Sequence, residues 1–498
     1  MEHIYKSYYT KSDPIVNYMV SNLDAQSGMN ILEPCAGDGV FIDALNGLKE
    51  SLLIDIYELN PKAVETLKDK YNSYPNIKIT HDDTITSTDL GFISEMGGKY
   101  DRIIANPPYG GWQDYDKRKD LKKYYGEIYV KETYALFLYR CIKLLKENGT
   151  LVFIIPDTYL NLHMFTSLRE FILTNTKIKE IALFPSKFFP GVNFGYSDLS
   201  IITLEKCVNR DECLNNEFRV LTGFTSVKQL ENTIHGSQQV HDFLQNDVFE
   251  SLDHSLFVVD NSLIMNLINS PQQRIGEVAD CVTGFYSGND KDSLYCSENA
   301  RSSSKYQRVD TNLISKDFQN RADILNGIEE PESFIPIVKG GGTKYYKQDL
   351  WFMDWSSTAV QHYKTFKKAR FQNPTFYFKL GIGVPMISSR SISGALIENK
   401  LFDQSIVGVF PRDAKWIYYL LAFFNSPTSN ILIRTINRST NNSANYIKKI
   451  PFISPDESTL QKINGITLEI IESIKANRDY NKQKEVQLNE IIQQLYGF

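Results

Sequence analysis

A short apolar run that ends in the tetrapeptide Asn-Pro-Pro-Tyr limits the possible folds of this chain more than any other feature. Residues 100–105, YDRIIA, are predicted to form a buried strand of a parallel sheet. Pro107 and Pro108 can extend neither a strand ladder nor a helix, so the chain leaves the sheet where this strand ends. Open α/β sheets bind their ligands at this carboxyl edge. The sequence therefore predicts that Asn106 to Tyr109 lies over a ligand site.

The groups in this tetrapeptide suit a planar substrate that carries an NH2 group. The side-chain oxygen of Asn106 and the carbonyl oxygen of Pro107 can accept the two N–H protons, and the ring of Tyr109 can stack on the substrate. A strand followed by an ordinary surface turn is the alternative interpretation. Further polar residues at the ends of the preceding strands favour the ligand site.

A glycine-containing turn lies upstream and is typical of a nucleotide cradle. A strand is predicted to end at Leu32, and a helix is predicted to begin at Phe41. Between them, Gly37 and Gly39 permit a tight turn and a close approach of the backbone to a ligand. The turn lacks the third glycine of the dinucleotide fingerprint, which argues against NAD.

Acidic residues follow the next two predicted strands. Glu58 ends a strand at residues 52–58 and lies where such folds bind ribose hydroxyls. Asp82 and Asp83 follow a strand at residues 77–79, where a carboxylate can reach the amino group of an adenine. Because parallel strands end at a shared edge, we expect these acids beside the glycine turn and the tetrapeptide. The same patterns predict helices at residues 14–23, 61–71 and 135–146, and strands at residues 151–155 and 199–204.

Length and composition indicate an ordinary globular protein of several domains. At 498 residues the chain is too long for one typical core, so two or three domains are expected. Six cysteines without a CxxC pair argue against a zinc site and a disulfide framework, and they fit a reducing cytoplasm. No apolar run approaches the roughly 18 residues of a transmembrane helix. Met1 to Tyr5 lacks the start of a signal peptide.

The net charge of −5 hides a strongly basic region. Residues 351–450 contain 13 Lys and Arg against 4 Asp and Glu, a net charge of +9. A basic region in an otherwise acidic protein suggests a surface that faces a polyanion, and a solvated basic face is the alternative.

These residues, in this order, resemble the N6-adenine DNA methyltransferases of the γ arrangement, the group of the TaqI-type modification enzymes. Tyr8-Tyr9-Thr10 is similar to the first motif of that family, and Glu33 to Phe41 is similar to its S-adenosylmethionine loop. Asn106 to Tyr109 matches its catalytic motif. Phe189-Pro190 resembles a later motif whose Phe stacks on the other face of a flipped adenine. The resemblance is close over residues 5–205.

The resemblance implies a role for each matching residue. The implied catalytic residues are Asn106, Pro107, Pro108, Tyr109 and Phe189. The implied contacts to the cofactor come from Tyr9, Thr10, Glu33, Cys35, Ala36, Gly37, Gly39, Glu58, Leu59, Asp82, Asp83 and Asn106. The family has one Asp near the cofactor adenine. Both Asp82 and Asp83 fit that role, and the spacing slightly favours Asp83.

Cytosine C5-methyltransferases use the cysteine of a Pro-Cys dipeptide as their nucleophile, and this chain contains the same dipeptide at Pro34-Cys35. Here the dipeptide lies inside the glycine turn, so its thiol would face the cofactor. A nucleophilic role for Cys35 is therefore rejected.

The resemblance also implies how the chain is divided. A Rossmann-like α/β methyltransferase domain with a mostly parallel seven-stranded sheet is expected at residues 1–212, an α+β target-recognition domain at 213–455, and a helical segment at 456–498. Residues 387–391 are interpreted as a loop that faces a DNA groove. Basic side chains would contact DNA phosphates. The candidate contacts are Lys117, Arg118, Lys122, Arg390, Arg434, Arg438 and Lys448.

The expected activity is transfer of a methyl group from S-adenosyl-L-methionine to N6 of an adenine that is flipped out of double-stranded DNA. No metal is expected. A restriction-modification system in a prokaryotic cytoplasm, with a separate endonuclease as a possible partner, is the implied setting. Two alternative functions are a methyltransferase with a different substrate and a protein without catalytic activity. One is an N-methyltransferase for a protein glutamine or an RNA base, for which the long C-terminal part would lack a role. The other is a non-catalytic DNA-binding specificity protein, against which the intact motifs argue.

Overall fold

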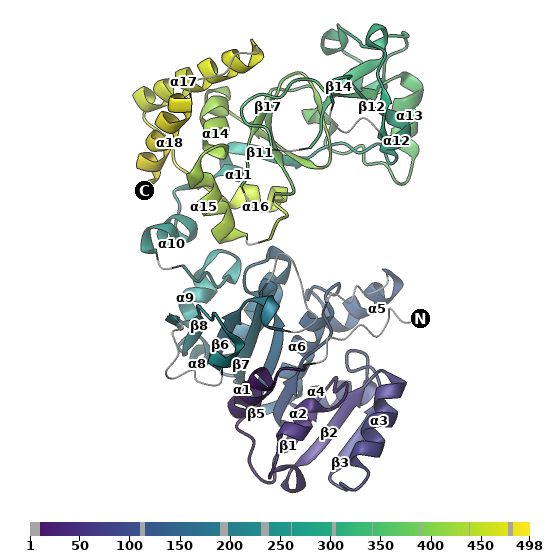
Figure 1. Ribbon diagram of the computed structural model, residues 1–498, viewed down its shortest axis with the longest axis vertical. Helices are drawn as coiled ribbons and strands as arrows, with labels where there is room; N and C mark the ends of the chain where they lie inside the picture. The colour runs from purple at the N-terminus through teal and green to yellow at the C-terminus, as the bar shows by residue number, and fades with distance from the viewer. Residues whose placement is uncertain are drawn as a thin grey trace. The chain divides into compact units, whose positions relative to one another are not determined.

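The computed structural model describes residues 10–109, 115–189, 198–230, 239–259, 261–300, 305–340, 342–388, 391–437, 439–476 and 482–498. The chain folds into two compact units, Met1–Val258 and Val259–Phe498 (Figure 1).

A nine-stranded sheet forms the centre of the described part of the first unit, with the strand order β3-β2-β1-β4-β5-β7-β6-β8-β9. The strands are β1 (Asn30–Glu33), β2 (Leu53–Glu58), β3 (Ile77–His81), β4 (Tyr100–Ala105), β5 (Leu145–Pro156), β6 (Thr176–Phe184), β7 (Leu199–Lys206), β8 (Glu217–Thr222) and β9 (Gln239–Leu244). Strands β3, β2, β1, β4 and β5 are parallel, whereas β7 is antiparallel to both β5 and β6. The α/β class and the mostly parallel sheet are thus confirmed, and β8 and β9 extend the seven expected strands.

Helices connect the parallel strands, and the order of these strands determines where a ligand crevice lies. The helices of this unit are α1 (Asp13–Leu23), α2 (Val40–Ala44), α3 (Pro61–Tyr71), α4 (Thr88–Glu95), α5 (Tyr115–Tyr125), α6 (Thr133–Leu144), α7 (Thr166–Asn175), α8 (Arg210–Leu214) and α9 (Gln245–Glu250). The strand order reverses at β1, so right-handed crossovers put α2 and α3 on one face of the sheet and α4 and α6 on the other. Such a reversal opens a crevice at the carboxyl ends of β1 and β4.

Local sequence explains most element boundaries. Helix α3 spans the predicted residues because the Asn60 side chain accepts a hydrogen bond from Lys62 N at its start, and Pro61 occupies its first turn. Strand β4 has the predicted bounds. Helix α6 ends at Leu144, two residues before its predicted end, because the chain turns directly into β5 there.

The first unit extends beyond the boundary predicted at residue 212, which lies inside α8. Strand β8 adds in parallel to β6, and β9 adds antiparallel to β8. The fully buried Gln245 side chain donates from Nε2 to the carbonyl oxygens of Leu173 and Thr176, at 2.8 and 2.7 Å, and accepts from Ile178 N at 3.1 Å. These contacts bind the segment after residue 212 to the sheet, which corrects the predicted boundary.

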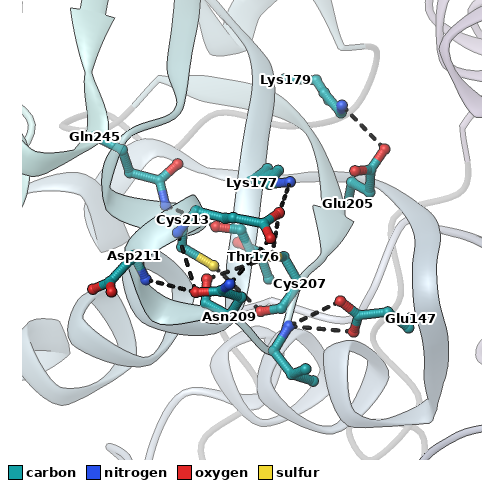
Figure 2. Close-up of polar contacts among 12 residues, drawn as sticks. Glu147, Thr176, Lys177, Lys179, Glu205, Cys207, Asn209, Asp211, Cys213 and Gln245 are labelled. Carbon is teal, nitrogen blue, oxygen red and sulfur yellow. Dashed lines mark hydrogen bonds and ion pairs between the residues drawn. The ribbon is translucent and has the colours of Figure 1, made fainter.

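Figure 2 shows polar contacts of Asn209 and its neighbours, which lie between β7 and β8 in the sequence. The Asn209 side chain accepts hydrogen bonds from the N–H groups of Asp211 and Glu212 and so caps α8. Lys177 on β6 forms an ion pair of 2.7 Å with Glu212. The predicted domain break therefore falls on a short helix that is attached to the sheet.

The second unit has the α+β composition that was predicted. Its strands are β10 (Gln273–Arg274), β11 (Ala279–Thr283), β12 (Leu294–Cys296), β13 (Gln307–Arg308), β14 (Phe334–Val338), β15 (Trp351–Asp354), β16 (Gly381–Pro385), β17 (Ala395–Ile397), β18 (Leu401–Phe402), β19 (Ile406–Pro411) and β20 (Pro451–Phe452). They form sheets ordered β11-β19-β16-β17, β13-β12-β15-β14-β18 and β10-β20. An aromatic core surrounds the fully buried Trp355, with Phe285, Tyr363 and Tyr377 around it.

The C-terminal helices belong to the second unit. The helices here are α10 (Ser262–Asn269), α11 (Ile275–Val278), α12 (Asp290–Ser293), α13 (Ser357–Thr365), α14 (Ile417–Phe424), α15 (Pro427–Ile436), α16 (Ala444–Lys449), α17 (Glu457–Lys475) and α18 (Lys482–Tyr496). The helical pattern predicted for residues 456–498 is confirmed in α17 and α18, which pack on each other and on α14 and α15. The Tyr496 hydroxyl donates to Pro451 O at 3.0 Å and ties α18 to β20.

Candidate active site

The carboxyl edge of the sheet brings the predicted site residues together. Glu33 ends β1 and Glu58 ends β2, and the two strands are parallel neighbours. Glu58 lies in register with His81 at the end of β3, so Asp82 and Asp83 follow at the same edge. Strand β4 pairs with β1 on its other side and delivers Asn106. The predicted convergence of these residues is confirmed.

The glycine turn is held in a conformation that most residues resist. Gly37 and Gly39 have φ values of +56° and +75°, in the left-handed region. Glu58 fixes the turn, because its Oε2 accepts from Gly37 N at 2.8 Å and its Oε1 accepts from Asn60 N at 2.7 Å. Ala36 N donates to Tyr57 O at 3.3 Å and joins the turn to β2. The turn is thus held in one conformation by contacts with the end of β2.

Glu33 is an uncompensated acid at the base of the cradle. Its side chain is 1% exposed, and Oε2 has no hydrogen-bond partner among the described residues. Burial raises the pKa of Glu33 well above its ordinary value, and the nearby Glu58 carboxylate adds to this effect. A buried carboxyl oxygen without a partner is costly, and a bound cationic group would satisfy it. The site therefore suits a ligand with an ammonium group.

The two aspartates after β3 differ in what they already contact. Asp83 Oδ1 accepts from Ile85 N at 3.1 Å, and its Oδ2 forms an ion pair of 3.0 Å with Lys117. Asp82 Oδ1 accepts from Asp83 N at 2.8 Å, while its Oδ2 has no hydrogen bond within the described part of the chain. Leu59 beside them is 41% exposed and offers an apolar surface. The geometry favours Asp82 over Asp83 as a ligand for an amino group.

Asn106 is positioned by contacts from two other predicted site residues. Its Nδ2 donates to Thr10 Oγ1 at 3.1 Å, and Thr10 is 4% exposed. The Cys35 thiol donates to the Asn106 backbone carbonyl at 3.5 Å. Burial raises the pKa of Cys35 well above its ordinary value, and the Glu58 and Glu33 carboxylates add to this effect. The thiol stays protonated, which agrees with its rejection as a nucleophile.

The remaining catalytic candidates are covered by protein. Pro107 is buried and Pro108 is half-buried. Tyr109 and Phe189 are 3% and 1% exposed and both lie in the hydrophobic core cluster of the first unit. Stacking on a base would require exposure of these rings, so that role stays a prediction. Tyr9, named as a cofactor contact, lies outside the described residues.

Comparison with known proteins shows the kind of domain to which this sheet edge belongs. Residues 42–189 match the model of the Eco57I restriction-modification methylase family. The type II methyltransferase M.HincII of Haemophilus influenzae is 33% identical over 186 residues, which are 36% of this chain and 34% of that protein. Residues 42–189 are thus similar to the Eco57I restriction-modification methylases.

The comparisons also reach beyond the methylase domain. The adenine-specific methyltransferase PglX of Lacticaseibacillus casei is 22% identical over 375 residues, which are 72% of this chain and 30% of that protein. The cryo-EM structure of the DrdV–DNA complex is similar in fold, with a TM-score of 0.57 and 13% identity, and the match covers 93% of this chain and 57% of that one. The matches to the two curated relatives cover only about a third of their lengths.

The basic candidates near the methylase site have different roles. Lys117 on α5 forms the ion pair with Asp83, so its charge is directed to the carboxyl edge of the sheet. Arg118 is half-buried, and Lys122 is exposed. The role of Lys122 as a DNA contact stays a prediction.

The candidate DNA contacts of the second unit also differ in their exposure and in their bonds within the protein. Lys448 on α16 is exposed. Arg434 on α15 instead donates to Ser388 O and Ser439 O, both at 2.7 Å, and burial lowers its pKa. Its predicted phosphate contact is corrected to an internal brace, because both ends of the guanidinium are used within the protein. Arg390 and Arg438 lie outside the described residues.

Two supporting residues of the methylase domain were not predicted. Tyr71 ends α3, and its hydroxyl donates to Gly39 O at 2.9 Å below the glycine turn. Thr84 Oγ1 donates to Pro34 O at 2.6 Å and is 2% exposed. A tyrosine at a helix end and a threonine in a loop carry no motif, so only the folded geometry reveals these roles.

The described residues contain no group of three or more His, Cys, Asp or Glu side chains that could hold a metal ion. Among their helices, none has the length and apolar character needed to cross a membrane.

Proposed function

We propose that this protein is a site-specific DNA methyltransferase of a restriction-modification system, which transfers the methyl group of S-adenosyl-L-methionine to N6 of an adenine in double-stranded DNA. The observation that supports this proposal most directly is the position of Asn106 beside the glycine cradle at one sheet edge, within a segment that matches the Eco57I-type methylases. The names of the relatives, including an adenine-specific enzyme, support this choice. A DNA substrate would place the enzyme at the nucleoid of a prokaryotic cytoplasm.

The cradle fits S-adenosyl-L-methionine on chemical grounds. The buried Oε2 of Glu33, which has no partner among the described residues, matches the ammonium group of the methionine part. Each Glu58 oxygen accepts one backbone N–H and retains a lone pair for a ribose hydroxyl. Asp82 Oδ2 can accept from the adenine amino group, and Leu59 can contact the ring. When bound, the cofactor supplies an electrophilic methyl group on a sulfonium centre.

The catalytic turn then prepares the amino group of the target adenine. Because Asn106 Nδ2 donates to Thr10, the amide presents Oδ1 as an acceptor for one N6 proton. The Pro107 carbonyl accepts the other proton. Two acceptors favour a tetrahedral nitrogen whose lone pair is directed at the methyl group, so positioning and oriented dipoles lower the barrier.

The target nitrogen is inaccessible inside a duplex, so the adenine has to be flipped out. Unstacking costs a few kcal/mol. Tyr109 and Phe189 would offset part of this cost by stacking on the two faces of the base once they are exposed. The basic region of the second unit, with Lys448 on its surface, would supply phosphate contacts and most of the salt-dependent affinity.

Methyl transfer from labelled S-adenosyl-L-methionine tests the proposal. The protein is incubated with unmethylated plasmid DNA, with an RNA pool and with a protein release factor in parallel reactions, and the modified positions are mapped. Label on adenine N6 within one repeated sequence is the expected result. Label on RNA or on a glutamine side chain would replace the proposal with the alternative substrate classes. Cofactor binding without transfer to any of the three would contradict the proposed activity.

A further inference from the structure

Two loops of the second unit are joined into one surface element, here called the two-loop platform, which comprises residues 386–388 and 439–442. Ile387 and Asn441 face each other in an antiparallel bridge. Ser388 N donates to Thr440 O at 2.9 Å, and Asn442 N donates to Met386 O at 2.6 Å. The loops are therefore linked through their backbones on both sides of the bridge.

Buried polar side chains support the platform from within the unit. Arg434 donates to Ser388 O on one loop and to Ser439 O on the other, and its Nη1 also contacts Asn442 Oδ1 at 3.3 Å. The fully buried Asn437 donates from Nδ2 to Asn441 O at 2.9 Å. These contacts use the carbonyl groups that point inward, so the platform backbone has a defined position while its outer side chains remain available.

The outer side chains of the platform include an unusual apolar group. Ile387 is 74% exposed, more than any other large apolar side chain that the structure describes. Asn441 across the bridge is exposed as well, and its amide makes no hydrogen bond to a described residue. The Thr440 hydroxyl beside it also has no such bond. A supported loop pair thus presents one isoleucine and one amide side by side.

The charge of the chain segment that contains the platform favours a polyanionic partner. The platform lies within residues 351–450, where the net charge is +9. Helix α16 begins at Ala444, directly after the platform, and carries the exposed Lys448. A protein partner with an acidic face would suit the lysines but would not explain an isolated amide and isoleucine pair. Base edges in a DNA groove suit both, since Asn pairs bidentately with adenine and apolar side chains contact the thymine methyl group.

We propose that the two-loop platform reads one A·T base pair in the major groove of the DNA substrate. Asn441 hydrogen-bonds to N6 and N7 of the adenine, and Ile387 contacts the 5-methyl group of the thymine. Residues opposite each other in such a bridge have Cβ atoms about 5 Å apart, close enough to contact the same base pair. The inference rests on the proposed function and names the residues that give it sequence specificity.

The experiment measures methylation of duplexes in which each base pair of the mapped recognition sequence is replaced in turn. We expect Asn441→Ala to lose discrimination at a single A·T pair by roughly 5- to 100-fold and to keep it at the other positions. Replacing the thymine of that pair by uracil removes the 5-methyl group. This replacement should slow the wild-type enzyme by the same factor as Ile387→Ala, and it should not slow Ile387→Ala further.

Two matched variants control for changes of surface alone. Ile431→Ala removes an isoleucine that is 38% exposed on α15, and Asn445→Ala removes an exposed asparagine on α16. Both should leave discrimination unchanged at every position. Unchanged discrimination in Asn441→Ala and Ile387→Ala would overturn the inference, as would a recognition sequence without an A·T pair besides the target. A wild-type enzyme that methylates no DNA would instead remove the proposed function, so the two failures are distinguishable.

Discussion

The sheet edge of the first unit and the basic region of the second unit differ in whether their polar side chains have partners within the protein. At the sheet edge, Glu33 and Asp82 each keep an oxygen without a hydrogen bond to a described residue. In the second unit, Arg434 uses its guanidinium on two loop carbonyls, and the buried Lys400 side chain forms an ion pair of 2.5 Å with the exposed Asp349. The edge therefore has polar atoms without partners among the described residues, whereas these two basic side chains are bonded within the second unit.

The difference follows from how each region is built. Parallel strands that alternate with helices must end at the same edge, so residues that follow them are brought together regardless of their neighbours. The second unit contains short strands and long connections, and loop backbones need partners for their carbonyl groups. Arginine and lysine are the available long donors. The number of arginine and lysine residues therefore gives the charge of the region. It does not show whether a given side chain contacts solvent or the protein itself.

The largest expected effect is at the sheet edge, where a single amide prepares the substrate. Asn106→Ala should reduce the rate of methyl transfer about 100- to 1000-fold, the usual effect of removing one preorganised polar group from an active site. Cofactor affinity should stay within about twofold, because the Glu33 and Glu58 contacts are untouched. Single-turnover kinetics and equilibrium binding of the cofactor measure the two quantities.

Thr10 provides the matched variants for this test. Thr10→Val removes the acceptor for Asn106 Nδ2 and should slow transfer about tenfold, a loss of one hydrogen bond, while Thr10→Ser should restore it. If Thr10→Val weakens cofactor binding and leaves the transfer rate intact, then Thr10 is a cofactor contact and not a positioning residue.

The glycine turn gives the second largest effect. Gly39→Ala puts a Cβ at 2.6 Å from Tyr71 Oη and 2.9 Å from Leu67 Cδ2, at a φ of +75°. The strain and the overpacking together should lower the free energy of unfolding by about 3 kcal/mol. Gly47→Ala is the control, because Gly47 has a φ of +78° and nothing within 4 Å of the added Cβ. It should cost only about 1 kcal/mol. Equal destabilisation in urea denaturation would show that contact with α3 is unimportant.

The contrast between the two regions also explains which predictions from the sequence hold. The strand at Tyr100–Ala105 and the helix at Pro61–Tyr71 follow from apolar runs and proline positions, which act locally. The convergence of Glu33, Glu58 and Asn106 follows from strand order, which a parallel sheet nearly dictates.

What the sequence missed depends on contacts between distant segments. The extension of the first unit to Val258 rests on the buried Gln245, whose partners lie about 70 residues earlier in the chain. The choice between Asp82 and Asp83 rests on Lys117, which arrives from another helix. Neither contact has a pattern that can be found along the chain.

Arg434 tests the proposed division of roles within the second unit. Arg434→Ala should lower the free energy of unfolding by about 2 kcal/mol, because it leaves the carbonyl groups of Ser388 and Ser439 without their donor. Its effect on the salt dependence of DNA binding should be negligible. Lys448→Ala should do the reverse, with unchanged stability and a salt slope reduced in magnitude by about 1. Chemical denaturation and binding at several salt concentrations separate the two. A reduced slope in Arg434→Ala would mean that the side chain reaches a phosphate after all.

The smallest expected effect distinguishes the two aspartates after β3. Asp82→Asn should weaken cofactor binding about tenfold, because it replaces a charged acceptor for the adenine amino group by a weaker one. Asp83→Asn should change binding less than about threefold. Its Oδ1 can still accept from Ile85 N, and the lost ion pair with Lys117 is partly exposed and so contributes at most about 1 kcal/mol. Titration calorimetry of both variants with the cofactor measures the difference. If Asp83→Asn has the larger effect, the ion pair must open when the cofactor binds, and Lys117 would then be released at the same step to reach DNA.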